Sequence, residues 1–208
     1  MAKTSGGNRP PSTGGFRRGD ANFKGRVGKL ESLSSIQNPH VYKAVKESIS
    51  RYHSRLGVRQ RDVKVAELPS RVGGVHITVN GKSSQVVLNK KVFNNPNTTT
   101  QSVASWAQAG YKSGFLTKTN KPISHIVTHE LSHATWNQYL TSPKAKAAGK
   151  DINKLYGTFL RDRKKKGYGK YANTNISEFF AEVATKAVHG NADRYTRSLK
   201  RIVKKYDL

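Results

Sequence analysis

Two histidines four residues apart, with a glutamate directly after the first, constrain this chain more than any other feature. The segment reads His129-Glu130-Leu131-Ser132-His133. Residues i and i+4 lie on one side of an α-helix, so a helix here would let both imidazoles reach a single ion. Apolar residues recur around the segment at helical spacing, and Pro122 suits a first helical turn, where its missing N–H is not needed. The pattern predicts a helix from Pro122 that offers two metal ligands.

A second pair of potential ligands lies further along the chain. A catalytic zinc usually has three protein ligands, and the chain contains no cysteine to supply a thiolate. Glu178 and Glu182 are again spaced i and i+4, within a segment predicted to be helical from Ile176 to Val188. In a chain with 38 basic and 12 acidic residues, two carboxylates on one helix face indicate a local cation. A pair of solvated or lysine-paired acids is the alternative.

The two segments together resemble a known family. The string Tyr171-Ala172-Asn173-Thr174-Asn175-Ile176-Ser177-Glu178-Phe179-Phe180-Ala181-Glu182, widely spaced after the histidine segment, is similar to the catalytic domain of anthrax lethal factor. That family of zinc endopeptidases, which includes the secreted Pro-Pro endopeptidases, belongs to the gluzincin class. The resemblance covers roughly residues 120–200, less than half of the chain.

The resemblance implies a zinc site and a role for each of its residues. His129, His133 and Glu178 would be the Zn²⁺ ligands, and Glu130 would be the general base that takes a proton from the attacking water. The implied fold is a compact zincin-like metallopeptidase fold, and the implied activity is hydrolysis of peptide bonds inside a chain.

Three further residues have expected places near this site. Tyr171 lies seven residues before Glu178, where the family has a tyrosine that contacts the oxyanion or protonates the leaving amine. A packing aromatic is the alternative, and Tyr168 is a competing candidate. Glu182 would orient a ligand histidine through its other ring nitrogen. His125, one turn before the first ligand, is expected to be a helix-face residue and not a fourth ligand.

The rest of the chain predicts the α+β class, with a small N-terminal sheet and a mainly helical C-terminal half. Apolar periodicity and turn residues define the other expected elements. These are helices over 39–56, 102–109 and 192–206, a strand over 63–68, and a hairpin of strands 75–79 and 84–88 joined by Asn80-Gly81. In the helix from Pro122, we expect one buried stripe of apolar residues.

Residues 1–30 differ in composition from residues 31–208, which we expect to form one metallopeptidase domain. The first 30 residues are rich in Gly and Pro and carry seven basic residues against one acid, Asp20. A segment with so few apolar groups cannot bury enough surface to offset the conformational entropy lost on ordering. We therefore expect a flexible basic tail. It would be either a solvated linker or an arm that binds a polyanion or docks on a partner.

The formal net charge of +26 predicts contact with nucleic acid or another polyanion. Basic residues gather at 161–166 and again in the last helix, at Lys200, Arg201, Lys204 and Lys205. No helix-turn-helix, zinc-finger or RNA-binding aromatic signature accompanies them. Contact would therefore be with the phosphate backbone and would weaken with salt.

Two functions from different classes follow. The first is a zinc-dependent endopeptidase acting on a protein or peptide, with the substrate extended along an edge strand. The second is a basic, nucleic-acid-associated structural protein that keeps the zincin fold, for which a bacteriophage particle would be a suitable setting. A toxin-like effector is a third, weaker option. No apolar run approaches the ~18 residues of a membrane span, and no secretory signal segment follows the N-terminus, so we expect an intracellular protein without Sec export.

Overall fold

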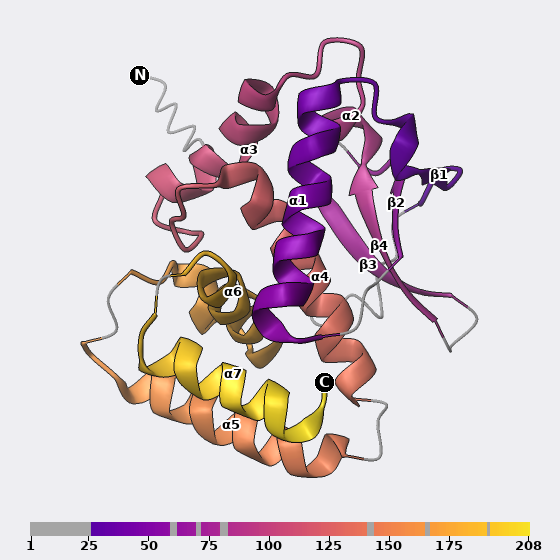
Figure 1. Cartoon of the computed structure of the whole chain (residues 1–208). Helices are drawn as coiled ribbons and strands as arrows, with labels where there is room; N and C mark the ends of the chain where they lie inside the picture. Colours follow the sequence, from indigo (N-terminus) through magenta and orange to yellow (C-terminus); the bar gives the residue numbers. More distant parts are fainter. Residues whose placement is uncertain are drawn as a thin grey trace, which may run out of the picture.

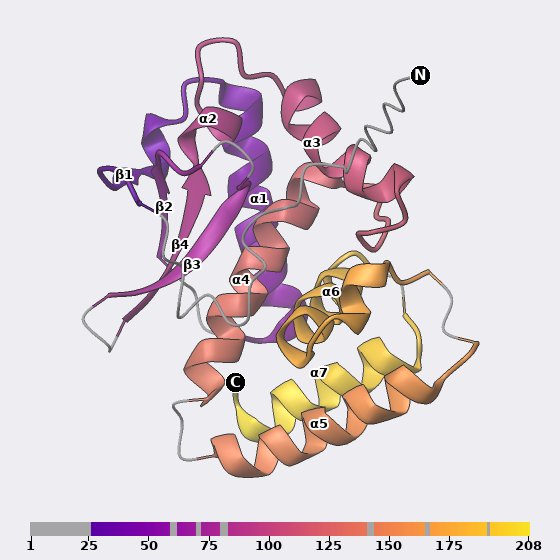
Figure 2. The ribbon, with the colours of Figure 1, turned by 180° about the vertical axis from the view of Figure 1, so that it is seen from behind.

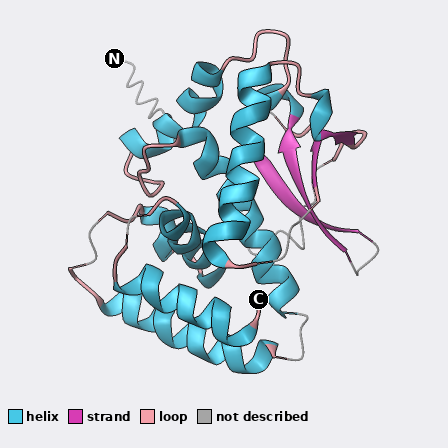
Figure 3. Cartoon of the chain, in the orientation of Figure 1, coloured by secondary structure: helices cyan, strands magenta, loops and turns pink. Residues whose placement is uncertain are grey.

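A small sheet lies at one side of the molecule and helices make up the rest (Figures 1 and 3). The computed structural model describes residues 26–208 except 59–61, 70–71, 80–82, 141–143, 165–166 and 191. In chain order the elements are β1 (Glu31–Ser32), the 3-10 helix η2 (Leu33–Ser35), α1 (Pro39–Leu56), β2 (Val63–Ala66), β3 (Gly74–Val79), β4 (Ser83–Asn89), α2 (Lys90–Phe93), α3 (Thr100–Lys112), α4 (Pro122–Leu140), α5 (Ala145–Arg161), the 3-10 helix η3 (Lys170–Asn173), α6 (Ile176–Val188) and α7 (Arg194–Tyr206). The predicted α+β class is confirmed. Most of the predicted tail, up to residue 25, lies outside the described residues.

The sheet has the strand order β1-β2-β4-β3. The predicted hairpin is confirmed, since β3 and β4 pair antiparallel with Val75 opposite Val87, although its Asn80-Gly81 turn lies outside the described residues. β2 pairs parallel with β4. After β2 the chain therefore passes the position next to it, forms β3 at the edge, and returns as β4 between the two, an arrangement that the sequence did not predict. No other described strand pairs with the outer side of β3, which makes β3 an edge strand.

Helix α1 forms where the sequence predicts it and covers one face of the core. Its apolar stripe is fully or almost fully buried. Asn38 caps the helix by accepting from the backbone N–H of Val41, and Gly57 ends it in the left-handed region at φ 72°. The Tyr52 hydroxyl donates to Thr135 Oγ1 of α4 at 2.8 Å, which fixes the two helices against each other.

Helix α4 is the inner helix of the molecule. It packs against α1, α3, α6 and the sheet, and both views show it between the strands and the C-terminal helices (Figures 1 and 2). Every residue from 124 to 136 is buried. We expected burial of one apolar stripe only, and this was wrong. Neighbouring elements cover all sides of this part of the helix, including its polar residues.

The C-terminal half is helical, as predicted. α6 has the predicted bounds, and α7 begins two residues later than expected because Asp193 caps it by accepting from the N–H groups of Tyr195 and Thr196. Helix α5 was not predicted. It lies alongside α7 on the far side of α6 from the sheet (Figures 1 and 2). Among the described residues, no helix combines the length and apolar character needed to cross a bilayer.

Candidate metal centre

Helices α4 and α6 bring three potential metal ligands together in the interior. His129 Nε2 lies 3.0 Å from His133 Nε2, and each of these atoms lies 3.3 Å from Glu178 Oε2. A tetrahedral zinc with bonds of about 2.0–2.1 Å holds its ligand atoms about 3.3 Å apart. The donor types and the triangle that they form therefore fit such an ion, and these buried His and Glu groups could hold a metal.

The position of Glu178 is determined at the start of α6. Asn175 caps the helix, and its Oδ1 accepts from the backbone N–H of Glu178 at 3.0 Å. Ser177, the residue before Glu178, places its Oγ 2.9 Å from His133 Nδ1. The same helical turn thus supplies one ligand and orients another.

Glu182 lies one turn further along α6, on the other side of the His129 ring. Its Oε1 is 3.0 Å from His129 Nδ1, and its Oε2 accepts from the backbone N–H of Thr117 at 2.7 Å. A carboxylate at Nδ1 keeps the proton on that nitrogen and leaves Nε2 free to bind a metal. This is the position that the resemblance implies for Glu182.

Carboxylates dominate the electrostatics of the site. Burial by itself would lower the pKa of His129, but Glu178 and Glu182 on its two sides outweigh burial and raise the pKa to about 10. Burial would raise the pKa of Glu178, yet the imidazoles of His133 and His129 lower it to about 2. The imidazoles of His125 and His129 likewise outweigh burial and lower the pKa of Glu182. Both carboxylates are therefore ionised near neutral pH, and the cluster attracts positive charge.

His125 is buried and takes part in a second, overlapping group of potential ligands. Its ring stacks on that of His129 at 5.9 Å, and its Nε2 lies 3.5 Å from Glu182 Oε1. These two residues and His129 Nδ1 also lie close enough to hold an ion. If both groups held a metal at once, the His129 ring would have to bind through each nitrogen and lose both ring protons, so the two groups compete for the same imidazole.

Glu130 lies next to the ligands and has an unusual environment. It is only 2% exposed, burial raises its pKa, and its Oε2 has no hydrogen-bond partner among the described residues. A buried carboxylate oxygen without a partner is costly, and such groups are typical of working sites. Gly74 of β3 lies against this side chain, since a Cβ at Gly74 would come within 2.9 Å of Glu130 Cγ.

Tyr171 is held against the site by η3. Its ring stacks on His129 with centroids 5.8 Å apart and on Phe115 at 4.6 Å, and its backbone N–H donates to Phe115 O. Gly169 permits this approach, because a Cβ there would collide with the same carbonyl oxygen. Tyr168, the competing candidate, instead donates to Asp193 at the start of α7.

Three groups that were not among the predicted site residues also contribute to this site. Ser177 and the Thr117 backbone contact His133 and Glu182, and Gly74 borders Glu130. Ser177 could have been found by its place between the Asn175 cap and Glu178. The other two act through backbone brought in from distant segments, for which a single sequence has no pattern.

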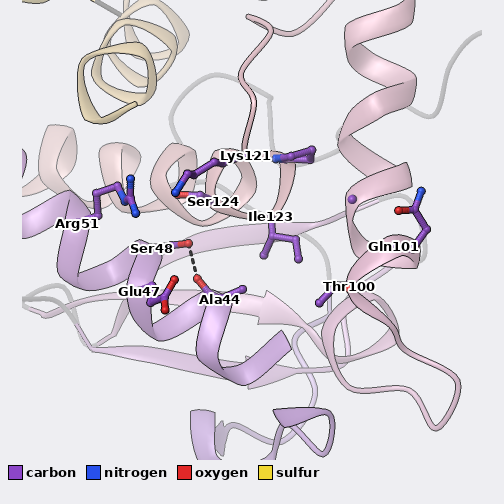
Figure 4. A pocket seen from close by; sticks show the side chains of 11 residues that line it. Ala44, Glu47, Ser48, Arg51, Thr100, Gln101, Lys121, Ile123 and Ser124 are labelled. Carbon is purple, nitrogen blue, oxygen red and sulfur yellow. Dashed lines mark hydrogen bonds between the residues drawn. The ribbon is translucent and has the colours of Figure 1, made fainter. Parts of the chain in front are cut away.

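The site is closed to solvent. His129, His133, Glu178, Glu130 and Tyr171 are each at most 3% exposed. A pocket of about 370 Å³ lies elsewhere, between α1 and the starts of α3 and α4, where Ser48 donates to Ala44 O (Figure 4). None of the five site residues lines that pocket, so it is a separate feature.

The chain matches no protein-family model and no curated protein, and its fold matches no solved structure. The resemblance to the lethal factor family therefore rests on the motifs alone.

Proposed function

We propose that this protein is a zinc-dependent endopeptidase with a zincin-like fold, related to the lethal factor type. One observation carries the proposal: Glu130 lies beside a ligand triangle of His129, His133 and Glu178 with edges of 3.0–3.3 Å, and one of its carboxylate oxygens has no hydrogen-bond partner in the described part of the chain. A purely structural metal site has no use for such a carboxylate.

Each residue has a task in this mechanism. His129, His133 and Glu178 would hold the zinc, which would supply a Lewis acid for the scissile carbonyl and lower the pKa of water toward neutrality. Glu130 accepts the proton of the attacking water through its carboxylate and passes it to the leaving nitrogen. Glu182 holds the proton of His129 on Nδ1.

Tyr171 is the proposed partner of the oxyanion. Stacking on His129 keeps its ring at the site, and its phenol would donate a hydrogen bond to the carbonyl oxygen as negative charge develops there. Removing one such donor typically costs about 10²–10³ in kcat.

The edge of β3 is the proposed binding line for an extended substrate. Gly73 O accepts from the Asn89 N–H at 3.0 Å. The odd-numbered residues of β3 are therefore the ones whose backbone groups form hydrogen bonds with β4. The N–H and C=O groups of Gly74 therefore point to the outer edge, where a peptide could add as another strand. Gly74 also touches Glu130, which brings this edge to the base. Because the site is closed, the surrounding segments must open for a peptide to enter.

The test separates catalysis from metal binding. We expect Glu130→Gln to keep one zinc per chain, measured by mass spectrometry, and to lose at least about a hundredfold in cleavage of a peptide library. The control is Glu47→Gln, the same change at an exposed glutamate on α1. Cleavage by Glu130→Gln at the wild-type rate would refute the mechanism, and zinc without cleavage in the wild type would make the site structural.

A second candidate function is a nucleic-acid-associated structural protein on the same fold, for example within a virus particle. The excess of 38 basic over 12 acidic residues favours it, and it can coexist with peptidase activity. Affinity for DNA that falls steeply with salt would support it, and no binding at low salt would exclude it.

A further inference from the structure

Helices α5 and α7 form an antiparallel pair with a strongly basic outer face. The start of α5 contacts the end of α7 through Asp151 and Lys205, at 3.0 Å. The end of α5 contacts the start of α7 through Asp162, which pairs with Arg194 and accepts from the Tyr195 hydroxyl at 2.7 Å. These contacts at both ends hold the two helices side by side (Figures 1 and 2).

The charge on this pair is almost entirely of one sign. α7 contains six basic residues and no acidic residue, and all six are at least partly exposed. They are Arg194, Arg197, Lys200, Arg201, Lys204 and Lys205. α5 adds Lys146, Lys150, Lys154 and Arg161, all exposed, with Asp151 as its one acid.

The spacing makes this charge unfavourable in the free protein. Lys146, Lys150 and Lys154 follow one another at i+4 along α5, and Arg201 lies i+4 from both Arg197 and Lys205 on α7. Like charges at this spacing repel and destabilise a helix, whereas exposed helices commonly alternate sign. A bound polyanion would remove the repulsion, so the arrangement favours such a ligand.

The two rows of charge meet in a groove. A hollow of about 440 Å³ lies between the helices, lined by Lys154, Arg201, Thr158, Ser198, Leu155, Ile202 and the ion pair of Asp151 with Lys205. Hydroxyl groups and basic side chains are the groups that proteins use to bind phosphate oxygens. The 17 residues of α5 span about 25 Å, the length of about seven base pairs of duplex.

The chemistry of the face favours a nucleic-acid duplex over a single strand or a membrane. The rings of its tyrosines are already in contact with other groups, since Lys205 Nζ lies 4.7 Å over the Tyr206 ring and the Tyr156 ring packs on Phe179 at 5.1 Å, which makes them poor stacking platforms for bases. The apolar side of α7 is buried in the core, and Leu160 is the one large apolar side chain exposed on the described part of α5. An interfacial membrane helix needs a free apolar face.

We propose that the α5–α7 face binds the phosphate backbone of duplex nucleic acid. Neither helix carries any of the proposed zinc ligands, and neither is part of the sheet, so this face is separate from the metal centre and from the edge of β3. Binding is independent of sequence, because the contacts are to phosphates.

The test compares two triple variants with the same change in charge. The face variant combines Lys154→Gln, Arg201→Gln and Lys204→Gln. The control variant changes exposed lysines on α1, α2 and α3 and combines Lys43→Gln, Lys91→Gln and Lys112→Gln. Fluorescence anisotropy with a labelled duplex of about 20 base pairs, from 50 to 200 mM salt, gives Kd and its salt slope. We expect the face variant to bind at least tenfold more weakly, with a slope smaller by two to three, and the control to change less than threefold.

Other outcomes would overturn the proposal. Equal weakening in both triple variants would mean that diffuse charge, and not this face, is responsible. Absence of duplex binding at 50 mM salt would also refute the proposal. Binding of the face to phosphatidylserine vesicles but not to the duplex would refute it as well. Two further measurements separate this test from the proposed peptidase activity. The face variant should keep its full zinc content, and Glu130→Gln should bind the duplex as the wild type does.

Discussion

His129 is in contact with more of the candidate site than any other residue. Its Nε2 faces His133 and Glu178, and its Nδ1 faces Glu182. Two carboxylates on opposite sides of one imidazole fix its orientation, and the one at Nδ1 keeps a proton on that nitrogen. The strength of metal binding should therefore depend on residues that never touch the metal.

Removing those supporting contacts should weaken zinc binding in a graded way. We expect Glu182→Gln to reduce zinc affinity by up to about a hundredfold and Ser177→Ala by about tenfold, because the serine is neutral and orients only His133. Competition with a chelator would measure both. Ser105→Ala, an exposed serine on α3, is the control and should bind as tightly as the wild type. Wild-type affinity in Glu182→Gln would contradict the orienting role.

Among the elements, η3 depends on a glycine for its position. Gly169→Ala would force a Cβ into the Phe115 carbonyl, so we expect a loss of about 1–3 kcal/mol in the free energy of unfolding and displacement of Tyr171. Gly157→Ala is the matched control. Gly157 lies inside α5 with no close contact to a new Cβ, so alanine there should stabilise by about 0.5–1 kcal/mol. Urea unfolding would measure both, and equal effects would refute the argument.

The junction of α6 and α7 should respond to acid. Burial would raise the pKa of Asp193, but Lys186, the Thr196 N–H and Tyr168 outweigh it and lower the pKa below its usual 3.8. A lowered carboxylate pKa stabilises the fold above pH 3.8 and ceases to do so as the pH falls through the folded value.

Asp193→Asn should therefore destabilise the protein by about 1 kcal/mol at pH 7 and by much less at pH 3, since asparagine still caps α7. Denaturant unfolding at the two pH values gives both differences. Asp62→Asn, at an exposed aspartate that lies 3.4 Å from Lys64, should change little at either pH. A constant difference across this range would show that the charge of Asp193 is unimportant.

The same elements show what the sequence could predict. Helix α1 and the hairpin were predictable because their apolar spacing and turn residues are local. Helix α5 was missed because its apolar stripe is short and two glycines, Gly149 and Gly157, interrupt it. The site residues at i and i+4 were predictable from helical spacing, and the structure brings them together. The contacts of Thr117 and Gly74 with the site depend on tertiary packing, so they could not be predicted from the sequence.

For the whole molecule, a bound metal would join two central helices, α4 and α6. α4 and α6 carry the ligands, and they pack against most of the other helices. We expect zinc at about 100 times its Kd to stabilise the protein by about 2.7 kcal/mol, seen as a rise in Tm that a chelator reverses. Glu178→Ala should lose this response. Metal analysis should give one zinc per chain, and two would indicate that the His125 group also binds.

The separation of the ligands along the chain also has a consequence for biosynthesis. Glu178 follows His133 by 178 − 133 = 45 residues. At about 5–20 residues per second, a ribosome needs about 2–9 s to add that stretch. Until then the nascent chain has both histidines and the base but not the third ligand. A chain that terminates before Glu178 would thus lack one of the three proposed ligands, and the proposed site can be completed only after the start of α6 has been made.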